Sequence, residues 1–90
     1  MVNEIELLNN LKAKKKNALE KIIITYTPYL NTVLFNMAGG ILSKEDSEEI
    51  ISEVFAVLWR NADKVSLDKG GIKSYISGIS KKLAAMKLRK

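Results

Sequence analysis

The sequence predicts an all-α protein, a compact bundle of three long helices and one short N-terminal helix. Apolar residues recur three and four positions apart along most of the chain, and no stretch alternates convincingly with a period of two. Proline occurs only once in the 90 residues. Because this length fits one globular unit, we expect a single domain over residues 1–90.

The first two helices follow from this periodicity. The first is expected over roughly residues 3–14, with Ile5, Leu8 and Leu11 on its buried face. The second is expected from about residue 17 to residue 37. Its expected buried side chains are Leu19, Ile22, Ile23, Tyr26, Leu30, Val33, Leu34 and Met37. Pro28 lies inside this helix and removes one backbone hydrogen bond, so we expect a kink or a local break there. Gly39 and Gly40 then end the helix.

The third and fourth helices have equally clear starts. Ser43 offers an N-cap oxygen with Asp46 three residues later, a variant of the capping box. The helix that follows is expected to reach about residue 62. Its expected buried side chains are Ile50, Ile51, Val54, Phe55, Leu58, Trp59 and Ala62. After the loop "DKVSLDKGG", the fourth helix runs from about Gly71 to the end. Its expected inner side chains are Ile72, Tyr75, Ile76, Ile79, Leu83 and Met86. This pattern is still strong where the chain stops, so we expect a fragment of a longer protein.

Composition excludes several classes of site. The chain has no cysteine and no histidine, which removes thiolate metal sites and the commonest general base. No nucleophile–base pair and no glycine-rich phosphate loop is present. We therefore expect no enzyme, no metal or other cofactor and no small-molecule substrate. No apolar run approaches the ~18 residues of a membrane span, and the N-terminus is unlike a secretory signal. We expect a cytoplasmic protein.

The charge is unevenly distributed along the chain. The formal net charge is +5, yet half of the ten acidic residues lie between positions 45 and 53. From residue 69 to residue 90 there are seven basic residues and no acid, and a second basic cluster lies near the N-terminus. Such asymmetry suggests two surfaces with different partners, one of them a polyanion.

Each charged cluster leaves alternatives open. The helix macrodipole explains Glu45 and Asp46 in a first turn, but it explains Glu49 and Glu53 poorly. These acids form either a solvated face or a docking surface for a basic partner. The basic last helix could be a solvated face, lie on an anionic membrane or contact nucleic-acid phosphates. The lysine face of this helix carries no acid, and the opposite face is expected to pack into the core. This combination favours contact with nucleic-acid phosphates.

The segment "SKEDSEEIISEVFAVLWRNADKV" resembles the stretch written approximately "REDAEDLVQEVFLRLWRNADRF" in bacterial RNA polymerase sigma factors of the extracytoplasmic-function group. The upstream "ALEKIIITYTPYLNTVLFNMAG", with its mid-helix proline, and the downstream "GGIKSYISGISKKLAAMKLRK" are similar to the same family. The resemblance covers about residues 17–90, and the E-V-F-x-x-L-W-R-N-A-D run is its most specific part. It implies the domain called sigma region two, without the helix-turn-helix domain that sigma factors carry further along the chain.

The resemblance implies a role in promoter recognition and melting during transcription initiation. The third helix would dock on the clamp helices of the largest subunit of core RNA polymerase, through Asp46, Glu49, Ile50, Ser52, Glu53 and Ala56. The loop over residues 64–71 and the fourth helix would bind the non-template strand of the minus-ten promoter element. The DNA-binding residues would be Lys69, Lys73, Lys81, Lys82 and Arg89, with Lys90 a further candidate. An anti-sigma factor is another partner implied by the family.

The chain also departs from the family pattern. At Lys82 an amide that can read a base is replaced by a charge that can only hold phosphate, and the loop has Val65 where phenylalanine is common. Two other classes of function stay open. One is a sigma-like interaction bundle that binds polymerase or an anti-sigma factor without reading DNA. The other is a membrane-surface helical protein, for which we expect no vesicle binding.

Overall fold

The computed structural model describes residues 3–89 and confirms an all-α fold. Four α-helices follow one another, α1 (Glu4–Lys12), α2 (Lys16–Ala38), α3 (Lys44–Arg60) and α4 (Gly71–Leu88). Two short 3-10 turns, Ala62–Lys64 and Leu67–Lys69, form the connection between α3 and α4. No strand occurs within residues 3–89. The molecule measures 37 × 21 × 20 Å.

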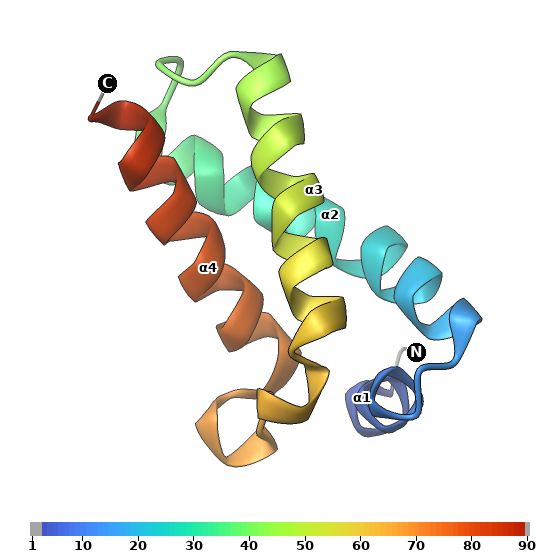
Figure 1. Cartoon of the computed structure of the whole chain (residues 1–90). Coiled ribbons are helices and arrows are strands. Elements are labelled where there is room, and N and C mark those ends of the chain that lie inside the picture. Colours follow the sequence, from blue (N-terminus) through green and yellow to red (C-terminus); the bar gives the residue numbers. More distant parts are fainter. Residues whose placement is uncertain (1–2, 90) are drawn as a thin grey trace.

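Helices α3 and α4 lie side by side and antiparallel, with α2 crossing behind both of them in Figure 1. The short helix α1 packs against α2 and against the end of the molecule where α4 begins. The C-terminal end of α4 therefore lies beside the loop that joins α2 to α3 (Figure 1). Because α2 covers one side of both α3 and α4, each of these two helices has another side that faces away from the bundle.

The predicted stripe of α3 is confirmed. Six of its seven side chains are buried, and the seventh, Trp59, is half-buried against the same core. The helix starts as predicted, because the Ser43 hydroxyl accepts from the Asp46 N–H at 3.0 Å and the Asp46 carboxylate accepts from the Ser43 N–H at 3.4 Å. These two bonds form the reciprocal capping box. The cap fixes where the acidic turn of α3 begins.

Helix α2 runs without interruption through Pro28, so the local break that the sequence suggested does not occur. Gly39 ends it as predicted, with φ +58° and its N–H donating to the Phe35 carbonyl at 2.7 Å. Two residues of its expected stripe, Ile23 and Met37, are exposed. The buried line instead uses alanines at its two ends, Ala18 and Ala38, where small side chains let the neighbouring helices approach.

In α1 the buried face is rotated from the predicted one. Leu7, Leu8 and Leu11 are buried, whereas Ile5 is 56% exposed. The spacing of Glu4 from these leucines puts its carboxylate on the inner side of α1.

In α4, five of the six predicted inner side chains lie in or against the core, namely Ile72, Tyr75, Ile76, Ile79 and Leu83. Ser77, Ser80 and Ala84 are buried together with Ile72 and Ile76. Met86, which was expected inside, is 53% exposed. The completely buried Ser80 hydroxyl donates to the Ser77 carbonyl at 2.9 Å, which satisfies its hydrogen bond within the helix.

Candidate protein and nucleic-acid interfaces

The start of α4 is positioned by glycines and by a side chain from α1. Gly70 and Gly71 have φ of +100° and +69°, a region that favours glycine. The Glu4 carboxylate accepts a hydrogen bond from the Ile72 N–H at 3.0 Å. A Cβ on Gly71 would lie 2.7 Å from that carboxylate. Glu4 thus caps the N-terminus of α4, where negative charge is stabilised by the helix dipole.

Burial raises the pKa of the Tyr26 phenol, and the negative charge of Glu4 raises it further. Glu4 therefore lies among α1, α2 and α4. Sequence reasoning missed this role, because an acid in the first turn of α1 looks like an ordinary dipole partner. The detectable signal was its spacing, three and four residues before the two buried leucines Leu7 and Leu8.

The five predicted DNA-binding residues that the structure describes are all exposed. The further candidate, Lys90, lies outside the described residues. Lys69 lies in the 3-10 turn before α4, Arg89 follows the last turn of α4, and three lysines lie at exposed positions along α4. Those three are Lys73, Lys81 and Lys82. Among residues 3–89, none of the five takes part in an ion pair. Their charge is therefore available to an external anion.

These basic residues do not form one row. Lys73 and Lys81 line a single groove between α2 and α4, with a volume of about 510 Å³, which begins at Gly70 of the preceding loop. We call it the basic groove. Lys82 lies roughly 180° around the helix from Lys73, and Arg89 lies on the same flank as Lys82. The fold therefore brings two of the five candidates together in a concave surface and leaves Lys82 and Arg89 on another part of α4.

A second groove lies between α3 and the C-terminal half of α4, with a volume of about 780 Å³. We call it the acidic groove, because three carboxylates line it, those of Asp46, Glu49 and Glu53. Exposed apolar side chains share its wall. These are Ile41 from the loop before α3, and Met86 and Leu88 from α4. Sequence reasoning placed Met86 in the core and assigned no role to Ile41 or Leu88.

Five of the six predicted polymerase contacts line the acidic groove. Glu49, Ser52 and Glu53 are exposed, and Asp46 is half-buried. Ile50 is only 2% exposed, so most of its side chain belongs to the core. The sixth, Ala56, is half-buried and lies outside the groove.

Lys87 of α4 bridges two of these acids. Its ammonium lies 3.3 Å from Asp46 Oδ1 and 3.1 Å from Glu49 Oε1. The hydrogen bond from Lys87, followed by those from Ser43, lowers the pKa of Asp46. The hydrogen bond with Glu49 is the main cause that raises the pKa of Lys87. Glu53 also has a basic neighbour, because Arg60 lies 4.0 Å away. The excess acid of α3 is therefore partly neutralised within the molecule.

Lys14 has a structural role that the sequence did not indicate. It adopts φ +59° just after α1. The N–H groups of Lys14 and Lys15 donate to the carbonyls of Leu11 and Asn10, the pattern of a Schellman cap. The Lys14 ammonium lies 4.4 Å from the centroid of the Trp59 ring and donates to the Trp59 carbonyl in the last turn of α3. The ammonium of this N-terminal lysine therefore has partners within the fold.

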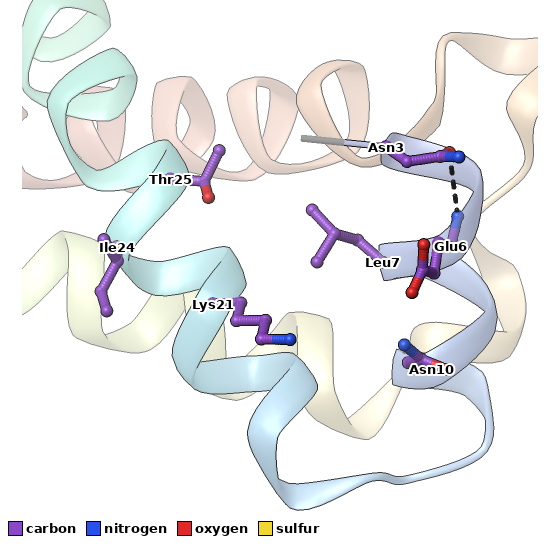
Figure 2. A pocket seen from close by; sticks show the side chains of 7 residues that line it. All are labelled: Asn3, Glu6, Leu7, Asn10, Lys21, Ile24 and Thr25. Carbon is purple, nitrogen blue, oxygen red and sulfur yellow. Dashed lines mark hydrogen bonds between the residues drawn. The ribbon is translucent and has the colours of Figure 1, made fainter. Parts of the chain in front are cut away.

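A third hollow, of about 310 Å³, lies between α1 and α2. Figure 2 shows Lys21 pointing from α2 toward α1, opposite Glu6 and Asn10, with the Asn3 side chain accepting from the Glu6 N–H. None of the predicted contact residues lines it. Within residues 3–89, no three acidic side chains gather in a way that could hold a metal ion. No helix in this part of the chain is long and apolar enough to cross a membrane.

Comparison of the chain with protein-family models, with curated proteins and with solved structures gave no match.

Proposed function

We propose that this chain is the promoter recognition and melting module of a sigma factor of the extracytoplasmic-function type. In this proposal the acidic groove binds the clamp helices of core RNA polymerase, and the basic groove binds the opened minus-ten element. The observation that carries the proposal is the division of charge between two neighbouring antiparallel helices. Acids of α3 line one groove, and two lysines of α4 that make no ion pair among residues 3–89, Lys73 and Lys81, line the other.

The acidic groove suits a helical protein partner. Exposed apolar side chains beside carboxylates match an amphipathic helix that carries lysine or arginine along its edges. A basic partner would compete with Lys87 for Asp46 and Glu49. The groove therefore selects for a partner that brings positive charge of its own.

The basic groove suits a single strand with a phosphate backbone. When lysines bind phosphates, the counterions condensed on the nucleic acid are released, so the affinity depends on salt concentration. Melting needs no chemistry beyond binding, because capture of an extruded base by stacking contributes about 1–3 kcal/mol. No cofactor enters this function.

A protein-only function is the second candidate, and the exposed apolar side chains of the acidic groove favour it. Ile41, Met86 and Leu88 share its wall with the carboxylates, as a surface for a protein partner would require. A bundle that bound polymerase or an anti-sigma factor through α3 would need no contact with DNA.

Two charge-reversal variants separate these functions. The first changes Lys73, Lys81 and Lys82 to Glu, and its control changes the exposed Lys15, Lys16 and Lys21 to Glu, with the same change in net charge. The first variant should lose binding to single-stranded minus-ten oligonucleotides but keep binding to bacterial core RNA polymerase. The control should keep both. Unchanged DNA binding by the first variant would eliminate the DNA role.

The second variant changes Glu49 and Glu53 to Lys, and its control changes Glu20 and Glu48, exposed acids outside the acidic groove. The groove variant should lose polymerase and keep DNA, while the control keeps both. Circular dichroism verifies that all four variants fold. Equal polymerase affinity for the groove variant and its control would contradict docking through α3.

A further inference from the structure

Tyr29 of α2 and Lys73 of α4 form a paired site in the wall of the basic groove. We propose that this pair binds one nucleotide of single-stranded DNA, with the tyrosine ring stacking on the base and the lysine ammonium binding the adjacent phosphate. The inference rests on the proposed function and identifies the residues that receive an unpaired base. Sequence reasoning did not name Tyr29, because it lies in a helix remote in sequence from the predicted DNA-binding residues.

The geometry joins an aromatic face, a cation and open space. The Lys73 ammonium lies 4.7 Å from the centroid of the Tyr29 ring. The groove around them is lined further by the hydroxyl-bearing Ser74 and Ser77 and by Lys81. The groove is an open depression with a volume of about 510 Å³, so a base stacked on Tyr29 would keep part of its surface exposed to solvent.

Glycine keeps one wall of this groove open. Gly78 lies in the middle of α4, where glycine costs roughly 0.5–1 kcal/mol relative to alanine. A Cβ built there would meet nothing within 4 Å. Core packing therefore does not require this glycine. Its effect is to leave space beside Lys81 and the two serines.

The chemistry of both partners matches a nucleotide. Every base has a π-face that can stack on an aromatic ring, so the contact requires no particular sequence. The Lys73 ammonium makes no ion pair among residues 3–89, so a phosphate would be its first anionic partner. Lys81 lies two turns further along α4, about 12 Å away by helical rise, and can hold another phosphate of the same strand.

A second lysine–aromatic pair within residues 3–89 differs from this one. Lys14 also lies over a ring, that of Trp59, but it donates to a backbone carbonyl as well. That lysine is held by the fold. Lys73 has the ring as its one recorded side-chain partner within the described residues, so it can turn toward a ligand without breaking the core. Tyr75, the aromatic residue nearest to Lys73 in sequence, is half-buried against the core, as Tyr29 is, but it does not line the basic groove.

The test compares two fluorescent probes of equal length, oligothymidylate and an abasic deoxyribose-phosphate strand, by anisotropy. Tyr29→Ala should weaken oligothymidylate binding about 5- to 150-fold, the equivalent of one stacked base, and leave the abasic strand unchanged. Tyr29→Phe should bind like the wild type. Lys73→Gln should weaken both probes and lower the salt slope by about 0.7. Lys21→Gln is the matched control and should change neither probe.

Gly78→Leu provides a second variant in case Tyr29→Ala does not fold. Leucine is a good helix former and would fill the groove, so this variant should fold and lose oligothymidylate. If the wild type binds oligothymidylate but Tyr29→Ala and Gly78→Leu bind it equally well, the nucleotide site is wrong and the proposed function stands. An equal loss of both probes in Tyr29→Ala would also overturn the stacking role. Failure of the wild type to bind either probe would overturn the proposed function itself.

Discussion

The Glu4 carboxylate accepts a hydrogen bond from the Ile72 N–H at 3.0 Å, across 68 positions of sequence. This contact makes α1 the N-terminal cap of α4. Glycine at position 71 suits this contact, because its φ of +69° favours glycine and a Cβ there would displace the Glu4 carboxylate. The short first helix therefore determines where the basic helix begins, and with it the position of the loop in front of the basic groove.

Removing this cap should destabilise the whole domain. Glu4→Ala leaves a half-buried N–H without its acceptor and removes a favourable charge from a helix N-terminus, so we expect a loss of about 1–2 kcal/mol. Urea unfolding followed by fluorescence of the single tryptophan measures it. Glu6→Ala, in the same turn of α1 but exposed, is the control. Similar losses in the two variants would refute the capping role.

The contribution of the Lys14 backbone conformation to stability should be separable from that of its side-chain contacts. Lys14→Ala loses the contacts with Trp59 and keeps the positive φ, which costs a residue with a Cβ roughly 1 kcal/mol. Lys14→Gly loses the same contacts without that cost. We therefore expect Lys14→Gly to be more stable than Lys14→Ala by about 1 kcal/mol in urea unfolding. The reverse order would mean that the left-handed conformation is not strained.

The two variants should share one spectroscopic change. Both remove the ammonium above the indole ring, so the emission of Trp59 should shift equally in both. A shift in only one of them would show that the backbone change, rather than the lost cation, alters the environment of the ring.

Substitution of Gly70, which precedes α4, and of Gly78, in the middle of α4, should change stability in opposite directions. Gly70→Ala would force a side chain into φ +100° and place its Cβ 2.5 Å from that of Ser74, so we expect a loss above about 1 kcal/mol. Gly78→Ala meets no neighbour and should stabilise the helix by about 0.5–1 kcal/mol. Thermal unfolding of the two proteins measures both effects. A loss of stability in Gly78→Ala would show that this glycine is needed for packing.

The ion pairs of Lys87 should give a pH-dependent stability. The pKa of Asp46 is lowered from 3.8, so its contribution is present above pH 3.8 and is lost as the pH falls through the folded value. The pKa of Lys87 is raised from 10.5, so its contribution is present below pH 10.5 and is lost as the pH rises through the folded value. The stability difference between wild type and Lys87→Met should therefore be largest between these limits.

Denaturant unfolding at pH 3, 7 and 11 measures that difference. Lys82→Met is the matched control, because this lysine makes no ion pair among residues 3–89. The control should show no such maximum. A difference for Lys87→Met that stays constant down to pH 3 would exclude the pairing with carboxylates.

The sequence predicted α3 best, and its chemistry explains why. The capping box Ser43–Asp46 is local, and the large apolar residues of its stripe leave one choice of buried face. In α4 the prediction missed Ser77 and Ser80, which are buried although serine usually lies outside. The Ser80 hydroxyl bonds within its own helix, so burial requires no partner that a pattern could reveal.

The charges of the candidate site were predictable, but their pairing was not. Lys87 and Asp46 are 41 residues apart, and Lys14 and Trp59 are 45 apart. Nothing local marks which lysine meets a carboxylate and which remains available to a ligand. The two grooves likewise exist only after α2, α3 and α4 have packed, so sequence reasoning could name their charged residues but not Tyr29, Ile41 or Met86.

The most direct test of the two-surface account is whether this chain joins DNA and polymerase in one complex. Core bacterial RNA polymerase, the chain and a labelled single-stranded minus-ten oligonucleotide are mixed and separated by native gel electrophoresis. The account predicts a labelled species with the mobility of polymerase that forms only when the chain is added and that charge reversal of either groove abolishes. A chain that binds the oligonucleotide only when polymerase is absent, or polymerase only when the oligonucleotide is absent, would contradict it.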